Sequence, residues 1–312
     1  MTISFAKCLQ AVRNDKQITQ QEALDTLISS DESLSKLDLT TYSRWERGVT
    51  KPKLSKQLLV ARILGADSTS LIDPEANAPE KKRQVLDYVH SRTKDPYSKS
   101  SADFTAYQDI SLKDKEDLHQ QIVTFHTDYL QQNLEPSALL NDNLHVNVFV
   151  DGDNKLVGHM IYGYVEIDTP SVLLNPNKLE ECPFVNEERR PDLDLALYLV
   201  SMYCSLIPPR MVAILSLIEL LKQNQNIKHL YANLHDQEGY NLYNSNVECT
   251  VLTKGNQEPY GGVKVYGKHY RYVQIKANAD EILASKVIAN IVPFTDEYLS
   301  SLLDGTGSDC SR

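Results

Sequence analysis

The 312-residue chain lacks several features that would narrow its class at once. Its five cysteines contain no C-x-x-C pair, which argues against a metal site or a disulfide framework and fits a reducing cytoplasm. Its N-terminal residues form no apolar signal core. The uncharged apolar run between Asp194 and Arg210 has about fifteen residues, fewer than the roughly 20 of a membrane-spanning helix. We therefore expect a soluble cytoplasmic protein with no metal site and no membrane contact.

The chain also lacks the overall positive charge that nucleic-acid-binding proteins usually carry, since its formal net charge is −10. The charge is uneven, however. Residues 1–66 hold ten Lys and Arg against seven Asp and Glu, whereas the rest holds 22 against 35. A mildly basic N-terminal part on an acidic body is typical of a DNA-binding module joined to a domain with another partner.

The segment from Asp38 to Lys53 predicts a short helix with two different faces. Asp38 is a suitable N-cap, and Gly48 suits the left-handed turn that ends a helix. Tyr42 and Trp45 lie three residues apart and share the inner face. The outer face carries hydroxyl and arginine side chains, which suit the major groove of DNA.

The run Ser-Arg-Trp-Glu-Arg-Gly at 43–48, followed by Thr-Lys-Pro, resembles the recognition helix of the Cro/repressor-type (XRE) helix-turn-helix family. The resemblance implies a set of DNA-contacting residues, which are Gln20 (or its neighbour Gln21), Leu39, Thr40, Ser43, Arg44, Arg47, Lys51 and Lys53. Arg44 would read a guanine and Leu39 a thymine methyl, and the lysines would contact phosphates. Residues 29–37 depart from the family pattern, in which the turn between the second and third helices is only a few residues long. Either the second helix is longer or an extra turn projects beside the DNA.

Composition and apolar spacing divide the chain into four parts. Residues 1–73 predict five helices, which form an all-α helix-turn-helix bundle. Residues 74–101 are rich in loop-forming residues and predict a linker with a connecting helix at 81–92. Residues 102–278 predict a mixed α/β (α+β) domain. Residues 279–312 predict a helical tail that covers the core of its own domain or forms a dimer contact.

The α/β part begins with a helix at 115–131 and a hairpin around Asp151-Gly152-Asp153-Asn154. The elements expected after the hairpin are a strand at 193–206, a helix at 210–223, a strand at 229–234, a helix at 237–244 and a strand at 263–275. Over residues 102–276 this order resembles the GNAT (N-acetyltransferase) superfamily. The resemblance implies a mixed sheet and a site for acyl-CoA.

In GNAT enzymes an R-x-x-G-x-G/A loop holds the pyrophosphate of acyl-CoA at a helix N-terminus. The segment that would form this loop contains Arg210, Val212 and Ala213, and Leu215 replaces the second small residue. The glycines that let a backbone approach phosphates are therefore missing, and the preceding Pro208-Pro209 pair supplies no N–H groups. We expect no cofactor, with acyl-CoA as the alternative.

Three residues are candidates for chemistry in this domain. Tyr243, in Asn-Leu-Tyr, resembles the GNAT tyrosine that protonates the departing thiolate, although a tyrosine among 17 is more often a packing residue. Glu166 is a candidate general base by its placement at a strand end, and His159 suits a structural role.

The first functional hypothesis is a sequence-specific DNA-binding transcriptional regulator that binds double-stranded DNA as a homodimer. Its GNAT-like domain would sense a small molecule, dimerise or bind a protein partner. Two alternatives remain open. One is an active acyl-CoA-dependent N-acyltransferase with a DNA-targeting module. The other is an antitoxin or phage-type repressor that binds a protein partner.

Overall fold

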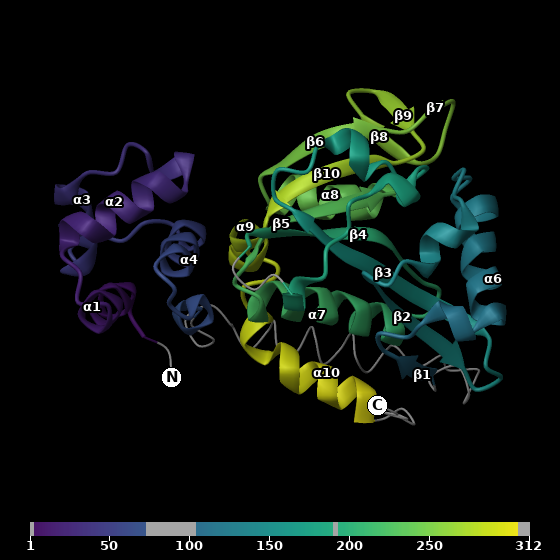
Figure 1. The fold of residues 1–312 in the computed structure, drawn as a ribbon, viewed down its shortest axis with the longest axis horizontal. Helices are drawn as coiled ribbons and strands as arrows, with labels where there is room; N and C mark the ends of the chain where they lie inside the picture. The colour runs from purple at the N-terminus through teal and green to yellow at the C-terminus, as the bar shows by residue number, and fades with distance from the viewer. Residues whose placement is uncertain (1–2, 73–103, 190–192, 305–312) are drawn as a thin grey trace. The chain divides into compact units, whose positions relative to one another are not determined.

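The computed structural model describes residues 3–72, 104–189 and 193–304 (Figure 1). Its contacts separate two compact units. The helical unit contains residues 3–72 and 280–294. The α/β unit contains residues 104–189, 193–279 and 295–304. The linker and connecting helix predicted within 74–101 lie outside the described residues.

Local capping explains the helices of the helical unit, which are α1 (Phe5–Asp15), α2 (Gln20–Ser30), η1 (Glu32–Leu34), α3 (Leu39–Glu46), α4 (Leu54–Ile63) and η2 (Ser68–Leu71). Thr19 and Glu22 form a reciprocal capping box at the start of α2. Asp38 accepts from the Thr41 N–H at 2.6 Å at the start of α3. Gly48 follows α3 with a φ of +71°, which confirms its expected left-handed turn.

The five-helix helix-turn-helix bundle expected from the sequence is not shown. The described residues 3–72 contain four α-helices, because the expected fifth helix is the four-residue 3₁₀ helix η2. The lengthened turn at 29–37 contains the 3₁₀ helix η1, whose Leu34 is buried. Tyr42 and Trp45 are buried as expected, and the Trp45 ring lies 5.9 Å from the Phe5 ring.

A segment far along the chain completes the helical unit. The short helix α9 (Ala279–Ala284) places Asp280 beside Arg62 of α4, and the Arg62 Nη2 lies 3.0 Å from the Asp280 Oδ1. Both side chains are buried, as are Ile282 and Leu283. The predicted helix at the start of the tail therefore packs within the helical unit, followed by η9 (Val292–Phe294).

The α/β unit is built on a seven-stranded sheet with the order β1-β2-β3-β4-β5-β10-β6 (Figure 1). Its strands are β1 (Phe104–Tyr107), β2 (Leu144–Asp151), β3 (Leu156–Glu166), β4 (Leu195–Cys204), β5 (Ile227–Leu234), β6 (Cys249–Lys254) and β10 (Val273–Asn278). β4 and β5 pair in parallel, and the other neighbours pair antiparallel. The sheet is mixed, and this confirms the α/β part of the expected fold.

Helices flank this sheet, and they are α6 (Glu116–Thr124), α7 (Ile207–Gln223), α8 (Gln237–Asn246) and α10 (Thr295–Asp304). α6 contributes Ile122 and Val123 to a core cluster with inward residues of β2–β4. α7 packs against β3 and β4, and α10 lies beside α7. Short 3₁₀ helices occupy the loops, at Leu112–Asp114 (η3), Pro136–Leu140 (η5), Ser171–Leu174 (η6), Leu179–Glu181 (η7) and Glu187–Arg189 (η8).

The prediction of a single final strand at 263–275 is wrong. The structure divides it into β8 (Val263–Val265), β9 (Lys268–Tyr270) and β10, and the first two join β7 (Gln257–Glu258) in a small separate sheet. Tyr266 and Gly267 connect β8 to β9 with φ values of +49° and +80°, a tight turn that reverses the chain.

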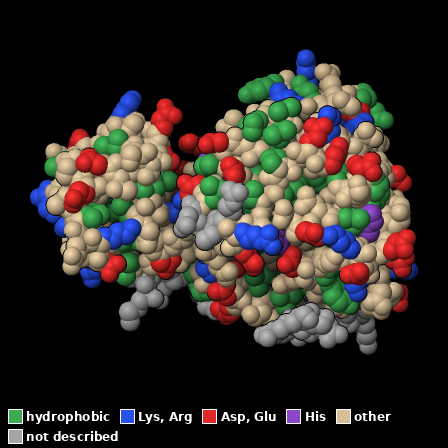
Figure 2. Space-filling view, in the orientation of Figure 1, with side chains coloured by type: hydrophobic (Ala, Val, Ile, Leu, Met, Phe, Trp, Pro, Cys, Tyr) green, Lys and Arg blue, Asp and Glu red, His purple; other side chains and the backbone are tan. Residues whose placement is uncertain are grey.

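The surface shown in Figure 2 has no single dominant charge. On the face in view, Lys and Arg side chains are scattered among Asp and Glu side chains. Among the helices of the described residues, none combines the length and the apolar character needed to cross a membrane.

Candidate active site

The two parallel strands at the centre of the sheet separate before they end. β4 and β5 pair only as far as Leu199 and Ala232, although β4 continues to residue 204 and β5 to residue 234. A β-bulge at Val200 falls at this point, because Leu199 and Ser201 pair with adjacent residues of β3. Bulges occur beside active sites, where they redirect side chains. Beyond the bulge, β4 is not paired with β5.

Five polar side chains form a continuous hydrogen-bonded chain here, the buried polar chain, which comprises His159, Ser201, His126, Gln132 and His235. The Nε2 of His159 lies 3.1 Å from the Oγ of Ser201, which lies 3.0 Å from the Nε2 of His126. The Nδ1 of His126 lies 2.7 Å from the Oε1 of Gln132. The Nε2 of Gln132 lies 3.4 Å from the Nε2 of His235. The first four residues are buried and His235 is half-buried.

Burial keeps the three histidines of this chain neutral. It lowers the pKa of His126 from its ordinary value. It lowers the pKa of His159 to about 3, with a further contribution from His126. It lowers the pKa of His235 to about 4, again with a contribution from His126. A neutral imidazole has one ring nitrogen that carries a proton and one that can accept a proton.

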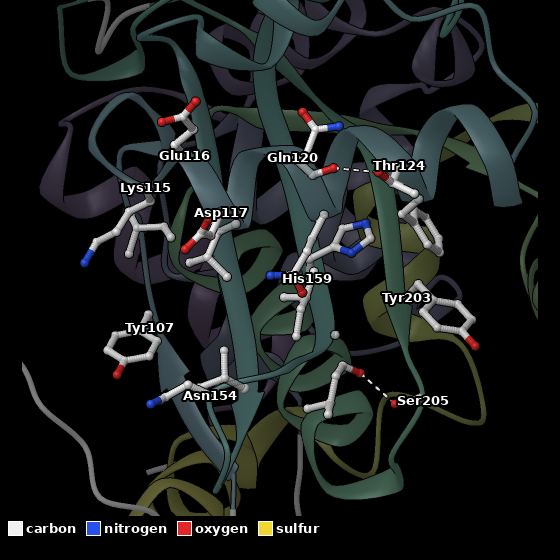
Figure 3. Close-up of a pocket in the computed structure, with 18 of the residues that line it drawn as sticks. Tyr107, Lys115, Glu116, Asp117, Gln120, Thr124, Asn154, His159, Tyr203 and Ser205 are labelled. Atoms are coloured by element: carbon white, nitrogen blue, oxygen red, sulfur yellow. Dashed lines mark hydrogen bonds between the residues drawn. The ribbon is translucent and has the colours of Figure 1, made fainter.

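A cavity of about 1140 Å³ lies in front of the buried polar chain, and Figure 3 draws the side chains that line it. His159 of β3 lies at the centre of this view, with Tyr107 and Asn154 on one side and Tyr203 and Ser205 on the other. The volume is slightly above the range of about 300–1,000 Å³ that is usual for small-molecule sites. The site therefore joins a cavity for a small molecule to a chain of groups that can accept a proton.

The helix over the cavity changes type where it reaches the site. α6 continues directly into a π-helical turn, η4 (Phe125–Tyr129). The Phe125 ring in this turn lies 4.6 Å from the His159 ring and 5.1 Å from the Tyr203 ring. The next residue, His126, belongs to the buried polar chain. Isolated π-helical turns occur frequently at functional sites.

A second group of side chains ties two loops to the sheet near the cavity. His145 of β2 places its Nδ1 2.9 Å from the Oδ1 of Asp109, next to the cavity-lining Ile110. Its Nε2 lies 3.3 Å from the Oε1 of Glu187, and its ring stacks on Tyr162 and meets the edge of Tyr164. Burial lowers the pKa of His145, but the two carboxylates outweigh it and raise the pKa above its usual value. Burial raises the pKa of Glu187, but His145 outweighs it and the net pKa is lowered.

These shifts predict a stability contribution that depends on pH. The His145 contribution is complete below its unfolded pKa and is lost as the pH rises through its raised folded pKa. The Glu187 contribution is lost as the pH falls through its lowered folded pKa. We expect His145→Phe to cost about 1 kcal/mol between these limits, since the pairs are partly exposed, and less at alkaline pH. Urea unfolding of both proteins over a pH series measures it, and a pH-independent difference would contradict the assignment.

The residues predicted for chemistry in the α/β unit do not gather at this cavity, whereas His159, which was expected to have a structural role, lines it. The segment 210–215 lies inside α7, where Val212 and Ala213 are buried. The exposed Arg210 donates from its Nη2 to the Cys204 carbonyl at 3.0 Å. Tyr243 is half-buried on α8, where burial raises its pKa to about 12. Glu166 is exposed at the opposite end of β3 from His159, roughly 23 Å away at the usual rise per residue.

The residues predicted to contact DNA lie in the helical unit. Leu39, Thr40, Arg44, Arg47, Lys51 and Lys53 are exposed, and Ser43 is half-buried. Gln20 has a partner within the unit, because its Nε2 donates to the Oε2 of the buried Glu46 at 2.6 Å. Glu46 also receives two hydrogen bonds from Arg13.

Sequence reasoning missed His126, Gln132, Ser201 and His235. One signal could have found one of them. Ser201 is an isolated polar residue between Val200 and Met202 in an apolar stretch, and buried polar groups require hydrogen-bond partners. Gln132 lies only six residues from His126, but Ser201 lies 75 residues from His126 and 42 from His159, so these two pairings have no local signature.

Comparisons with known proteins place these observations in context. No protein-family model and no curated protein matches the chain. Three similar solved structures are FeeM, an N-acyl amino acid synthase from uncultured soil microbes; TofI, in a ternary complex with an inhibitor and MTA; and BjaI, a CoA-dependent acyl-homoserine lactone synthase with SAM and isopentyl-CoA. Their identities are 11%, 10% and 11%, each with a TM-score of 0.34. The matches cover 56%, 61% and 67% of this chain and 91%, 99% and 94% of the other chains.

These comparisons correct the function expected from the sequence. The similar solved structures are described by the small molecules that they make or bind, and none by DNA. The prediction of a sequence-specific DNA-binding transcriptional regulator was therefore wrong, and the XRE resemblance is unsupported. The expectation that no cofactor binds is likewise unsupported, since two of these structures hold SAM, MTA or an acyl-CoA.

Proposed function

We propose that the α/β unit is a thioester-dependent acyltransferase, which moves an acyl group from the sulfur of a donor to a nucleophile in the cavity. One observation carries this proposal. β4 separates from β5 at the Val200 bulge, directly beside the buried polar chain and the cavity wall. This arrangement brings together an open strand edge, a proton acceptor and space for an acceptor molecule.

The open edge of β4 suits the extended arm of a thioester donor. Backbone N–H and C=O groups require partners, and an extended ligand with amide groups can supply them by adding alongside a strand. β4 provides such an edge beyond Leu199, where its pairing with β5 ends. Ser201 is the first residue after the bulge, so an arm that follows this edge passes the buried polar chain.

The start of α7 does not suit the pyrophosphate of acyl-CoA. Only Ser205 and Leu206 separate β4 from α7, and the first three residues of α7 are Ile207, Pro208 and Pro209. Two of these three lack an N–H group, and Ile207 presents an exposed apolar side chain. A helix N-terminus binds phosphate through its four free N–H groups, and two of the four are missing here. We therefore propose that the donor is held by its pantetheine arm.

This reading predicts that a truncated donor is a good substrate. We expect an acyl-N-acetylcysteamine thioester, which lacks the nucleotide, to have a KM within about tenfold of the matching acyl-CoA. Two hydrogen bonds to a charged phosphate would contribute about 3–6 kcal/mol, and losing them would raise KM by a hundredfold or more. Steady-state kinetics with both donors measures the ratio. A ratio above a hundred would show that the protein does hold the pyrophosphate.

The activity itself is tested with the purified full-length protein. Thiol release from acyl-CoA donors of increasing chain length is followed in the presence of a panel of amines, and the products are identified by mass spectrometry. Amines are the first acceptors to test, because Asp114, Glu116, Asp117 and Asp128 at the cavity outnumber Lys115. Acceptor-dependent thiol release with a matching acylated product supports the proposal. If no donor and acceptor pair exceeds spontaneous hydrolysis, the proposal fails.

A further inference from the structure

We infer that the Nδ1 of His159 is the general base of the acyl transfer, and that Ser201 and His126 carry the proton away from the cavity. This inference rests on the proposed function for its chemistry. Its structural part rests on the direction of each hydrogen bond in the buried polar chain, which can be assigned step by step from one end.

The assignment starts at His235, the half-buried end of the chain. A hydrogen bond with the backbone of Arg271 raises the pKa of His235, as a carbonyl acceptor does, whereas burial lowers it more strongly. The Nε2 of Gln132 lies 3.4 Å from the Nε2 of His235, and an amide nitrogen only donates, so the Nε2 of His235 is the acceptor. Gln132 therefore presents its NH₂ group to His235 and its carbonyl oxygen to His126.

The orientation of Gln132 decides the tautomer of the next histidine. With the NH₂ group turned to His235, the Oε1 of Gln132 faces the Nδ1 of His126 at 2.7 Å. An amide oxygen only accepts, so His126 carries its proton on Nδ1 and its Nε2 is bare. Ser201 must therefore donate its O–H to that Nε2, which lies 3.0 Å away.

The last step reaches the cavity. Because Ser201 donates to His126, its oxygen accepts from His159, which must carry its proton on Nε2 at 3.1 Å. The Nδ1 of His159 is then left with its lone pair. No described residue makes a hydrogen bond to that nitrogen, and His159 lines the cavity. Every bond in the chain points the same way, from His159 towards His235.

Because all the hydrogen bonds point the same way, His159 can take up a proton at the cavity while it releases its other proton towards Ser201. The lone pair of the acceptor nucleophile forms a bond to the thioester carbonyl carbon, and the carbon–sulfur bond breaks with its electron pair leaving on sulfur. The proton of the nucleophile goes to the Nδ1 of His159. His159 passes its Nε2 proton to Ser201, whose own proton moves to the Nε2 of His126. The positive charge on His126 is stabilised by the Oε1 of Gln132, which already accepts from its Nδ1.

The low basicity of the free histidine does not exclude this role. Burial is the main cause of its lowered pKa, because it penalises an isolated charge. During the transfer, negative charge develops on the thioester oxygen and sulfur in the same cavity, and this favours an imidazolium beside it. The relay also moves the charge from His159 to His126, and the hydrogen bond with Gln132 favours the charged form of that ring.

The first test reads the tautomers directly and requires no activity. In full-length protein labelled with ¹⁵N-histidine, the imidazole nitrogen shifts show which nitrogen of each ring carries the proton. The His159 signals are assigned from their loss in His159→Gln. We expect a proton on Nε2 of His159 and on Nδ1 of His126. A proton on Nδ1 of His159 would overturn the inference, whether or not the protein transfers acyl groups.

The second test is kinetic. Glutamine can reproduce the donor to Ser201 but not the basic Nδ1, so we expect His159→Gln to lower kcat by about 10²–10⁴-fold with KM unchanged. Ser201→Ala should lower kcat less and reduce the solvent deuterium isotope effect. The control is His119→Gln, since His119 is a half-buried histidine of α6 that bonds the Pro136 carbonyl and does not line the cavity, and its kcat should match wild type. Far-UV circular dichroism confirms that each variant is folded.

The outcomes distinguish the acyltransferase function from the role of His159 as its base. If wild type turns over thioesters and a folded His159→Gln variant keeps its kcat, His159 is not the base and the proposed function stands. If wild type turns over no thioester although the tautomers are as assigned, the proposed function fails and the catalytic role of His159 fails with it.

Discussion

In the Asp280→Ala variant the helical unit should unfold at a much lower urea concentration than in wild type, because its free energy of unfolding falls by about 3–5 kcal/mol. Asp280 and Arg62 form an ion pair in which both side chains are buried, with two hydrogen bonds of 3.1 and 3.0 Å from the guanidinium to the Oδ1 of Asp280. Removing the carboxylate takes a buried countercharge away from the guanidinium, which costs more than the loss of an exposed ion pair. The total stability of a domain is only about 5–15 kcal/mol, so this loss is large.

The only tryptophan of the chain makes this effect measurable. Trp45 is buried in α3, within the helical unit, and its fluorescence therefore reports the unfolding of that unit. The matched control is Asp25→Ala, because Asp25 is an exposed carboxylate of α2 that accepts one hydrogen bond from Gln21 at 2.8 Å. It should change stability by no more than about 0.5 kcal/mol. Equal midpoints for Asp280→Ala and Asp25→Ala would show that the buried pair does not stabilise the unit.

The buried pair also marks the limit of reading domains from sequence order. Residues 1–73 have the helical spacing of an independent bundle, and nothing local indicates that a segment more than 200 residues away belongs to the same unit. Yet Asp280, Ile282 and Leu283 are buried there with Arg62. The partner of a buried charge is set by tertiary packing, which a single sequence does not display.

Local structure was predicted well where a few neighbouring residues determine it. Thr19 and Asp38 cap their helices because each side chain bonds an N–H three residues ahead. The hairpin around residues 151–154 formed because Asn154 accepts a positive φ. The failure at residues 263–275 has the same basis. Tyr266 is an unusual residue for a turn with positive φ, so Gly267 was the single turn signal between β8 and β9.

Function was harder to predict because the strongest motif and the site lie in different units. The Ser43–Gly48 run is contiguous, so it was easy to match to a family. The buried polar chain draws His159, Ser201 and His126 from a strand, another strand and a π-helical turn. Each one is an ordinary residue in its own segment. Only the pairing of β3 with β4, and the π-helical turn beside them, brings the three together.

Asn233→Leu should destabilise the α/β unit by about 2–5 kcal/mol and abolish most of its activity. Asn233 bridges the separated strands, because its Nδ2 lies 2.9 Å from the Tyr198 hydroxyl and 3.3 Å from the Val200 carbonyl of β4. Its Oδ1 accepts from the Nε2 of Gln274 of β10 at 2.9 Å. Leucine keeps the volume but removes all three hydrogen bonds, and each buried polar group left without a partner costs about 1–3 kcal/mol.

The loss of activity follows from where this bridge lies. The Val200 carbonyl is at the bulge, one residue before Ser201, so the bridge fixes the point at which β4 leaves β5. Without it, the open edge of β4 and the Ser201 hydroxyl lose their fixed positions, and kcat/KM should fall by more than tenfold because transfer depends on ångström-scale placement.

Urea unfolding followed by far-UV circular dichroism and thioester turnover measure the two effects. Asn246→Leu is the control, because Asn246 is an exposed residue of α8 whose Nδ2 donates to the Leu242 carbonyl at 2.8 Å. It should leave both quantities near wild type, since its polar groups can bind water instead. If the Asn233→Leu protein is stable but inactive, the bridge is needed for activity and not for stability. A stable and active one would show that the strands separate without it.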